Sequence, residues 1–308
     1  MKCSKCNKKA VTFIRYNGTY LCKQHFMEYV EKRVRKDIRK QGLRKGIIAV
    51  ALSGGKDSLV ALYLMNDLFG KHKDKELHAI TVDEGIAGYR QKTIEIARKH
   101  CNFLGIEHHV VSFKEIIGFE LDEISKIRGE LGECTYCGVF RRLCLNKKGN
   151  EINAKTIAMG HNLDDVSQSI LMNFVKNDME RMARFAPHKK VQPGLIPRIL
   201  PLRTIPEKET TLYAFLRGIE VSEEECPYAV HASRGIFRDI IAKLENDYPG
   251  TRHSILNSYL AIDDCLQEKY LPAELQPCKI CGEPTSQEIC RACMLREKIE
   301  KAMDSSKN

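Results

Sequence analysis

Residues 47–58 read IIAVALSGGKDS, and this stretch decides the fold. Its first half is a short apolar run typical of a buried strand, and the helical pattern LVALYLMNDLF follows at once. Backbone N–H groups in a glycine turn at the start of a helix bind phosphate oxygens well. The turn also carries polar side chains that an ordinary strand-to-helix turn does not need, namely Ser53, Lys56, Asp57 and Ser58. The stretch predicts a phosphate-binding loop, and it is not a Walker A motif because the Gly-x4-Gly-Lys-Ser/Thr spacing is absent.

Strand and helix patterns alternate through the residues that follow. We expect, in chain order, a strand at Leu77–Val82, a helix at 89–104, a strand at His108–Phe113, a helix at 138–149, a strand at Thr156–Met159 and a helix ending near Val175. This alternation predicts an α/β fold with a parallel, doubly wound sheet. In such a sheet the ligand site lies outside the carboxyl ends of the strands.

Two more polar clusters follow predicted strands. Asp83 comes after the second strand, and Gly160-His161-Asn162 comes after the fourth. Asp164 and Asp165 are next, and for Asp164 the role of a helix N-cap competes with a role in chemistry. Because carboxyl ends of parallel strands meet at one edge, we expect these clusters beside the SGGKDS loop.

Cysteine spacing predicts a metal site near each end of the chain. Among the 13 cysteines, two sets have the spacing of zinc knuckles. The sets are Cys3, Cys6, Cys22 and His25, and Cys278, Cys281, Cys290 and Cys293. Both are complete quartets with no open coordination position, so they predict two structural Zn²⁺ sites in small flanking modules.

A third C-x2-C pair, Cys134 and Cys137, has no second pair nearby, and Cys226 stands alone before Pro227. Three such cysteines suit a [4Fe–4S] cluster whose fourth iron is left to a non-protein ligand. Three alternatives remain: a redox disulfide pair with a lone thiol, a third zinc with an unseen ligand, and inert core cysteines. Thiol chemistry without a cluster would also work, because Arg141 and Arg142 can lower a thiol pKa.

Composition limits the class of protein. The 308 residues carry 50 Lys+Arg against 40 Asp+Glu, and 43% are hydrophobic, which excludes a disordered chain. No apolar run approaches the ~20 residues of a membrane span, and the first residues lack a secretory signal, so we expect a cytoplasmic protein. The formal charge of +10 favours a polyanionic partner.

The SGGKDS loop resembles that of the N-type ATP pyrophosphatases, which cleave ATP between the α and β phosphates and adenylate a substrate oxygen. The resemblance implies the PP-loop fold of adenine nucleotide α-hydrolase-like proteins. It also implies that Mg²⁺ assists and that Asp57 and the Mg²⁺-linked Asp165 are catalytic. The ATP-binding residues it implies are Ala51, Ser53, Gly54, Gly55, Lys56, Asp57, Ser58, Asp83, Gly160 and His161.

The motifs taken in order resemble the tRNA 2-thiouridine synthetases over nearly the whole chain. In that family uridine O2 attacks the α-phosphate of ATP, pyrophosphate leaves, sulfur attacks C2 and AMP departs. The resemblance implies catalytic roles for Arg141 and for Cys134, Cys137 and Cys226 as cluster ligands. It further implies a homodimer, and a ubiquitin-like carrier protein or free sulfide as the sulfur source. The Phe140-Arg141-Arg142 sequence resembles the wobble-uridine branch of the family more than the uridine-54 branch, which implies position 34 as the target.

Residues 31–45 hold eight Lys and Arg against two acidic residues on a predicted linker helix. A charge run is most often a solvated face, but beside an adenylating site it predicts a path for the tRNA backbone. The candidates are Arg33, Arg35, Lys36, Arg39, Lys40, Arg44 and Lys45. Residues 176–203 add seven cations among prolines and predict an extended basic loop.

The predicted domains are a zinc module at residues 1–30, a basic linker helix at 31–45, the catalytic domain at 46–270, and a second zinc module with a helix at 271–308. Rival functions remain. One is another adenylating enzyme, such as a cytidine-32 thiolase, a lysidine synthetase or an amide-forming ATP pyrophosphatase. The other is a zinc-dependent RNA-binding scaffold without activity.

Overall fold

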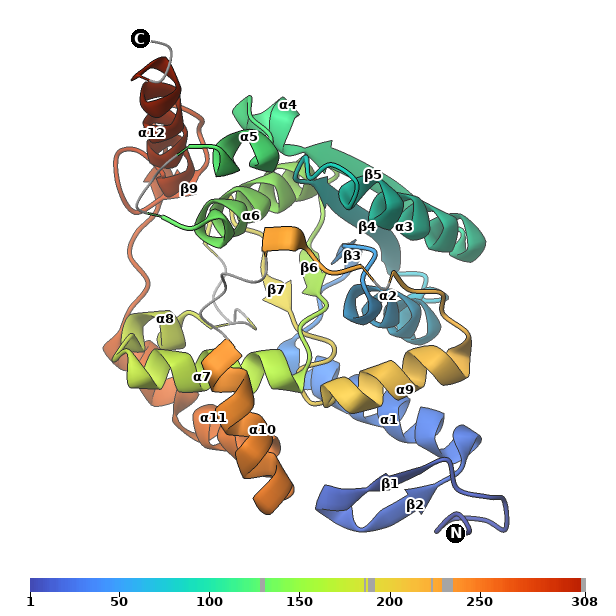
Figure 1. Cartoon of the computed structure of the whole chain (residues 1–308). Helices are drawn as coiled ribbons and strands as arrows, with labels where there is room; N and C mark the ends of the chain where they lie inside the picture. Colours follow the sequence, from blue (N-terminus) through green and yellow to red (C-terminus); the bar gives the residue numbers. More distant parts are fainter. Residues whose placement is uncertain (128–130, 186, 188–191, 223, 229–234, 306–308) are drawn as a thin grey trace.

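A five-stranded parallel sheet forms the centre of the molecule (Figure 1). The structure is a computed structural model, and it describes residues 1–127, 131–185, 187, 192–222, 224–228 and 235–305. The strand order is β5-β4-β3-β6-β7, and every neighbouring pair is parallel. The strands are β3 (Gly46–Ala51), β4 (Lys75–Asp83), β5 (Glu107–Ser112), β6 (Thr156–Met159) and β7 (Arg198–Ile199). The predicted α/β class is confirmed, and of the five strands in this sheet only β7 had no counterpart among the expected strands.

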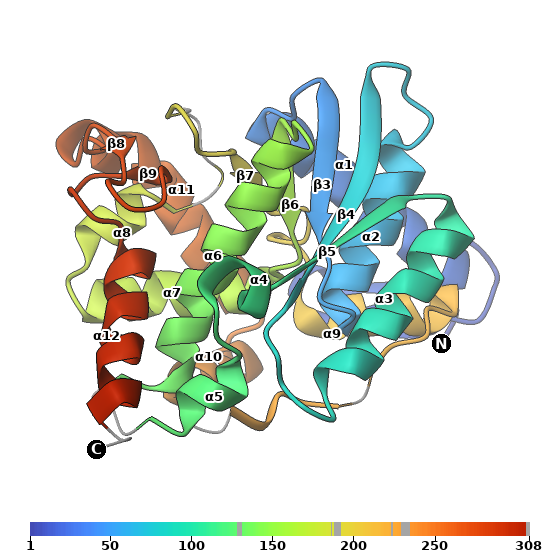
Figure 2. The same ribbon diagram turned by 90° about the horizontal axis from the view of Figure 1, so that it is seen from above.

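Helices cover both faces of this sheet. Figure 2 shows α6 (Glu133–Glu151) on one side of the strands and α2 (Lys56–Phe69) with α3 (Arg90–Leu104) on the other. Burial on both faces explains why the strands are continuous apolar runs without alternation. Ile48, Ala49 and Val50 of β3 are accordingly fully buried.

The direction of the connections changes at β3. From β3 the chain moves outward through β4 to the edge strand β5, and then returns to pair β6 with the other side of β3. The carboxyl ends of β3 and β6 thus form a topological switch point, where crevices for ligands occur in open α/β sheets. The SGGKDS loop follows β3 directly, so the fold puts it at this point.

Small cysteine-rich modules lie near the two chain ends, at opposite ends of the molecule (Figure 1). The first consists of the hairpin β1 (Thr12–Ile14) and β2 (Thr19–Leu21), joined by the 3-10 turn η1 (Arg15–Asn17), and the start of α1 (Lys23–Gln41). The expected border between residues 30 and 31 falls inside α1, because the helix continues across it. The second module contains β8 (Gln276–Pro277), β9 (Pro284–Thr285) and α12 (Arg291–Ser305), and α12 packs on α6.

Several helices were not expected from the sequence. Helices α4 (Phe113–Ile117) and α5 (Leu121–Ser125) precede α6, and α9 (Glu207–Arg217) packs on α2 and α1. The others join α7 (Leu163–Val175) in a helical layer of their own: α8 (Met179–Ala183), α10 (Gly235–Asp247) and α11 (Thr251–Lys269). No helix in the described ranges is both long and apolar enough to cross a membrane.

The extended basic loop expected at residues 176–203 is wrong in the described part. It contains helix α8 and strand β7. Of its cations, Arg203 is buried, Arg181 and Arg184 pair with acidic residues of α8 and its N-cap, and Lys189 and Lys190 lie outside the described residues.

A buried ion pair fastens α1 to the segment after β7. Arg203 Nε and a terminal nitrogen donate to the two carboxylate oxygens of Asp37 at 2.7 and 2.9 Å. Gln41 Nε2 donates to Asp37 Oδ2 at 2.6 Å and to the Leu200 carbonyl at 3.0 Å. Asp37, within the basic run, is therefore an internal anchor.

Replacing Asp37 with alanine leaves the Arg203 guanidinium buried without its partner. Removing one partner of such a pair costs about 3–5 kcal/mol of unfolding free energy. We expect a loss of that size in urea denaturation. Lys36→Ala, the exposed neighbour, is the control and changes stability by no more than about 0.5 kcal/mol. A loss below about 1 kcal/mol for Asp37→Ala would contradict the anchor.

Candidate active site

The phosphate loop is shaped by its own serines. Ser58 Oγ donates to the Gly55 carbonyl at 2.8 Å and accepts from the Ser53 backbone N–H at 3.1 Å. The Ser53 and Ser58 hydroxyls lie 3.0 Å apart. Gly55 is the N-cap of α2, so the loop runs straight into the positive end of a 14-residue helix. This arrangement suits an anion such as a phosphate.

At two positions glycine is required, because backbone atoms of another segment lie where a Cβ atom would be. Gly54 has φ +82°, and a Cβ there would lie 2.2 Å from the Thr93 carbonyl oxygen. A Cβ on Gly160 would lie 2.9 Å from the backbone of Ser58. Gly160 therefore lets the end of β6 pack directly against the first turn of α2, which brings the fourth-strand cluster to the loop.

A pocket opens at the carboxyl ends of β3, β4 and β6. Its lining residues are Ala51, Leu52, Ser53, Gly55, Lys56, Asp57, Ser58, Ile80, Val82, Glu84, Arg90, Arg141, Leu145, Met159, Gly160 and His161. Most of the residues expected to bind ATP are in this set. Gly54 and Asp83 are not in the lining, and the Asp83 carboxylate instead accepts the Gly85 N–H at 2.9 Å.

The loop cation is held by carboxylates. Lys56 Nζ lies 3.0 Å from Asp57 Oδ1 and 3.5 Å from a carboxylate oxygen of Glu207. Asp57 also accepts the Thr210 hydroxyl at 2.8 Å, which fixes it against α9. An entering phosphate can take over the Lys56 ammonium, because only rotation of a long side chain is needed.

Glu84 and Arg90 are site residues that the sequence analysis missed. Both are about 97% buried, and Arg90 Nε lies 2.6 Å from a Glu84 oxygen. Arg90 also donates to the carbonyls of Ser53 and Val82 at 2.8 and 2.9 Å. The other Glu84 oxygen lies 3.0 Å from Arg141 Nε. Strand alternation was the available signal, because Ile80 and Val82 face the pocket and Glu84 is next in that series.

The three mid-chain cysteines lie beside this pocket. Cys134 and Cys137 are in the first turns of α6, and Arg141, one turn further on, donates to Cys137 Sγ at 3.1 Å. Cys134 Sγ lies 3.7 Å from the carbonyl of Tyr228, two residues after Cys226. Each cysteine is near enough to another for their charges to interact, Cys137 with Cys226 and Cys226 with Cys134.

The three mid-chain sulfurs are spaced more widely than the ligands of a single ion. Among the described residues these sulfurs do not form a group within 4.8 Å, whereas both terminal quartets do. A four-iron cluster is larger than one ion and needs wider spacing. Burial raises the pKa of Cys137 and of Cys226, and the nearby Arg141 only partly offsets this. The expected lowering of a thiol pKa by arginine is therefore outweighed by burial.

The acidic pair after β6 has structural partners. Asn162, not Asp164, is the N-cap of α7, and Asp165 completes a capping box with it through bonds of 3.1 and 3.2 Å. Asp164 instead lies 2.6 Å from Arg252 Nε and accepts the Glu207 N–H at 2.8 Å. The competing N-cap role considered for Asp164 thus belongs to Asn162.

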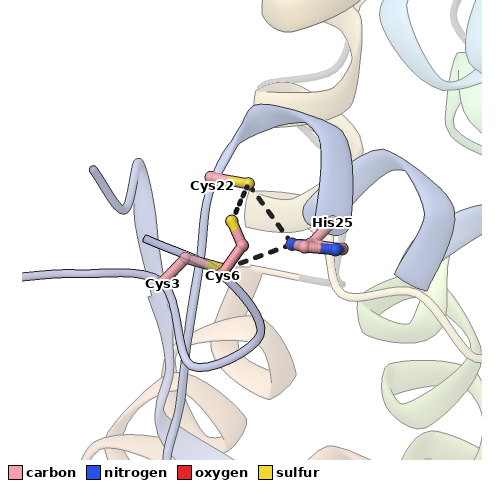
Figure 3. A group of neighbouring side chains, drawn as sticks. All are labelled: Cys3, Cys6, Cys22 and His25. Carbon is pink, nitrogen blue, oxygen red and sulfur yellow. Dashed lines mark hydrogen bonds between the residues drawn. The ribbon is translucent and has the colours of Figure 1, made fainter. Parts of the chain in front are cut away.

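Both terminal quartets are assembled. Figure 3 shows Cys3, Cys6, Cys22 and His25 converging on one point. Cys6 and Cys22 sulfurs lie 3.7 Å apart and Cys22 Sγ lies 3.5 Å from His25 Nδ1. Zn–S bonds of about 2.3 Å give tetrahedral edges of about 3.8 Å, so the spacing fits zinc. Cys278, Cys281, Cys290 and Cys293 form the second group, with Cys293 inside α12.

The cations of α1 divide between surface and interior. Exposed members are Lys32, Arg35, Lys36, Arg39 and Lys40, followed by Arg44 and Lys45 beyond the helix. Arg33 points inward, where it lies 3.1 Å from Glu209 and over the rings of Tyr16 and Tyr29. Arg33 therefore connects α1 to α9 instead of joining the exposed basic face.

The chain matches two family models. Residues 26–245 match the PP-loop domain, and residues 2–27 match the N-terminal LIM domain of the 2-thiouridine synthetase TtuA.

Relatives resemble the chain from end to end. The tRNA 2-thiolation protein NcsA of Haloferax volcanii is 37% identical over 97% of this chain and 99% of its own. The tRNA-5-methyluridine(54) 2-sulfurtransferase of Pyrococcus horikoshii is 35% identical over 95% and 93%. A solved structure, the U34-tRNA thiolase NcsA of Methanococcus maripaludis with its [4Fe–4S] cluster, is 36% identical, covers 97% and 96%, and superposes with a TM-score of 0.84.

Structure and comparisons agree on the family. The pocket lies at the switch point, Arg141 joins the cysteines to it, and relatives match over almost their full length. This chain belongs to the PP-loop family of tRNA 2-thiolation proteins.

Proposed function

We propose that the protein is a tRNA sulfurtransferase that converts a uridine to 2-thiouridine at the expense of ATP, with wobble position 34 as the favoured target. The observation that carries this proposal is the position of Arg141. Its side chain lines the phosphate-loop pocket and also donates to Cys137. One residue therefore contacts both the proposed nucleotide site and the cysteine region. The U34-tRNA thiolase of M. maripaludis supports the target. The uridine-54 enzyme of P. horikoshii has similar identity and supports position 54 as the alternative.

The adenylation step uses the loop. Uridine O2 forms a bond to the α-phosphorus of ATP, the bond to the β-phosphate breaks, and pyrophosphate departs. Lys56 and the start of α2 stabilise the charge that develops on the leaving group, and Mg²⁺, when bound, would add positive charge there. Mg²⁺ prefers oxygen ligands, and Asp57 supplies the nearest carboxylate on the loop. A sulfur nucleophile then adds at C2, and AMP leaves with the former O2.

Cys134, Cys137 and Cys226 would hold the [4Fe–4S] cluster. A bound cluster with one iron free of protein ligands supplies a place for the sulfide that is transferred. Arg141 orients this region from the protein side, because Glu84 fixes its guanidinium while it donates to Cys137. The sulfide comes from solution or from a ubiquitin-like carrier protein.

The remaining features fit tRNA as partner. The two quartets hold structural Zn²⁺, each without an open coordination position. The exposed cations of α1 contact tRNA phosphates, and the target base turns out of its loop to reach the pocket. The cytoplasmic 2-thiolation proteins among the relatives support a cytoplasmic location. The family resemblance also implies that the protein acts as a homodimer.

The reaction can be tested directly. Protein purified without oxygen, supplied with unmodified tRNA, ATP and sulfide, is expected to form 2-thiouridine together with AMP and pyrophosphate. Lys56→Ala should lower the rate by about 10²-fold or more, because one preorganised charge contact is lost. Lys71→Ala, an exposed lysine of the loop before β4, is the control. Mass spectrometry of a nuclease digest locates the thiolated uridine.

Thiolation without ATP, ADP as the product, or an unaffected Lys56→Ala enzyme would contradict the proposed reaction. Thiolation of a transcript whose U34 is replaced by cytidine would assign position 54 instead.

The basic face of α1 gives a separate prediction. Changing Lys36, Arg39 and Lys40 together to alanine should weaken tRNA binding and reduce the slope of log affinity against log salt by about three, one unit for each phosphate contact. Filter binding over a range of salt concentrations measures both quantities. The charge-matched control is Lys71, Lys73 and Arg98, which are exposed on other elements. Equal slopes for the two triple variants would show that α1 does not contact tRNA.

A further inference from the structure

Two histidines and a glutamate gather on β5, an edge strand of the sheet, and on its neighbour β4. His78 is in β4, and Glu107 and His109 are in β5. The parallel register pairs His78 with Glu107 and Ile80 with His109. Residues two apart on a strand share a face, so Glu107 and His109 are on one face. His108, between them, is on the opposite face, where its Nε2 lies 2.7 Å from the Thr81 hydroxyl.

This cluster lies away from the active site along β4. Val82 and Glu84 line the pocket at the carboxyl end of the strand, whereas His78 lies toward its amino end. At ~3.3 Å per residue, His78 and Glu84 are about 20 Å apart along the chain. The phosphate loop and the mid-chain cysteines therefore have no part in this cluster.

One ligand atom from each of the three residues lies within 4.8 Å of the other two, which is the spacing of a possible metal site. His78 Nδ1 lies 2.9 Å from His109 Nε2, His109 Nε2 lies 3.4 Å from Glu107 Oε1, and His78 Nδ1 lies 3.7 Å from Glu107 Oε2. Zinc bonds to nitrogen and oxygen of about 2.0–2.2 Å give a tetrahedron with edges of about 3.3–3.6 Å. The observed distances span that range, so small side-chain rotations would admit an ion.

The second ring nitrogen of His78, Nε2, has a carboxylate nearby. His78 is 5% exposed, and its Nε2 is a buried polar atom without a hydrogen-bond partner in the described residues. Glu76 Oε1 lies 3.1 Å away, outside hydrogen-bond geometry but within ion-pair distance. The Glu76 side chain is largely exposed and can rotate into line. A carboxylate that accepts the remaining N–H of a ligating imidazole fixes the tautomer and strengthens the ligand.

The groups that face His109 favour a neutral imidazole. Burial lowers its pKa most; the negative charges of Glu107 and Glu151 oppose this, and His78 and Lys148 add to it. Metal ligation requires neutral imidazole. Without an ion, the same two nitrogens can share one proton in a hydrogen bond between the rings, which is the competing account of the 2.9 Å contact.

We propose that His78 Nδ1, His109 Nε2 and a Glu107 oxygen bind a divalent transition-metal ion of the zinc type, with water as the fourth ligand. Imidazole and carboxylate ligands suit zinc, and three protein ligands leave one position to solvent. The ion joins β5, the edge strand, to β4 at the end of the sheet remote from ATP. Because this metal site shares no residue with the active site, its test does not depend on whether the proposed reaction is correct.

Equilibrium dialysis against Zn²⁺ tests the site in the full-length holoprotein, with its cysteine sites already loaded. Wild-type protein is expected to bind one additional Zn²⁺ per chain. Glu107→Gln and His109→Ala should each weaken that binding by about tenfold or more, and Glu76→Gln by about tenfold, as expected for an outer carboxylate. His108→Gln, the neighbour that faces the other side of the sheet, should bind like wild type.

Glu107→Gln keeps both histidines and changes a largely exposed side chain, so it decides the result even if His109→Ala fails to fold. The proposal is wrong if wild-type protein binds no additional Zn²⁺. In that case the two rings form only a hydrogen bond. The proposal is also wrong if Glu107→Gln binds the additional ion as tightly as wild type, since the ion would then be bound without Glu107.

Discussion

The active site depends on the hydrogen bonds and the ion pair of the buried Arg90 guanidinium. It donates to the carbonyl of Ser53 after β3 and to the carbonyl of Val82 in β4, and it pairs with Glu84. A buried charge is tolerated only when it is paired and hydrogen-bonded, so these groups are held in one arrangement. Glu84 extends the network to Arg141, and Arg141 extends it to Cys137. A continuous set of polar contacts therefore joins the phosphate loop to the cysteine region.

This network places the phosphate loop and the cysteine region side by side. Adenylation needs cations and N–H groups at the phosphates, while sulfur transfer needs the sulfur close to uridine C2. The switch point of the sheet supplies the first set, because the loop after β3 opens helix α2. In the proposed reaction helix α6 supplies the second, because its first three turns carry Cys134, Cys137 and Arg141. Because the phosphate-binding groups and the cysteine region are adjacent, an activated base can be attacked by sulfur without leaving the site.

The sequence was sufficient to predict those parts of the structure that a local residue pattern determines. The β3 run and its glycine loop could be predicted because buried parallel strands are continuous apolar runs. Glu84 was not predicted, although it continues the alternation of Ile80 and Val82, because Asp83 is the acidic residue that directly follows the apolar run. Arg33 was assigned to tRNA because a charge run does not reveal which members face inward. The spacing of Val30, Val34 and Ile38 marks the buried stripe of α1, but the pairing of Asp37 with Arg203 joins residues far apart in the chain, and only the tertiary fold determines it.

The most direct test of the account is a count of iron and acid-labile sulfide in protein purified without oxygen, compared with Cys226→Ala. Cys265→Ala is the matched control, because Cys265 is an exposed cysteine on α11 outside every cysteine group described above. The account predicts about four irons per chain in wild type and in Cys265→Ala, and their loss in Cys226→Ala. Zinc at about two per chain with no iron in the wild-type protein, even after reconstitution, would contradict the cluster and return sulfur transfer to the thiols of Cys134, Cys137 and Cys226.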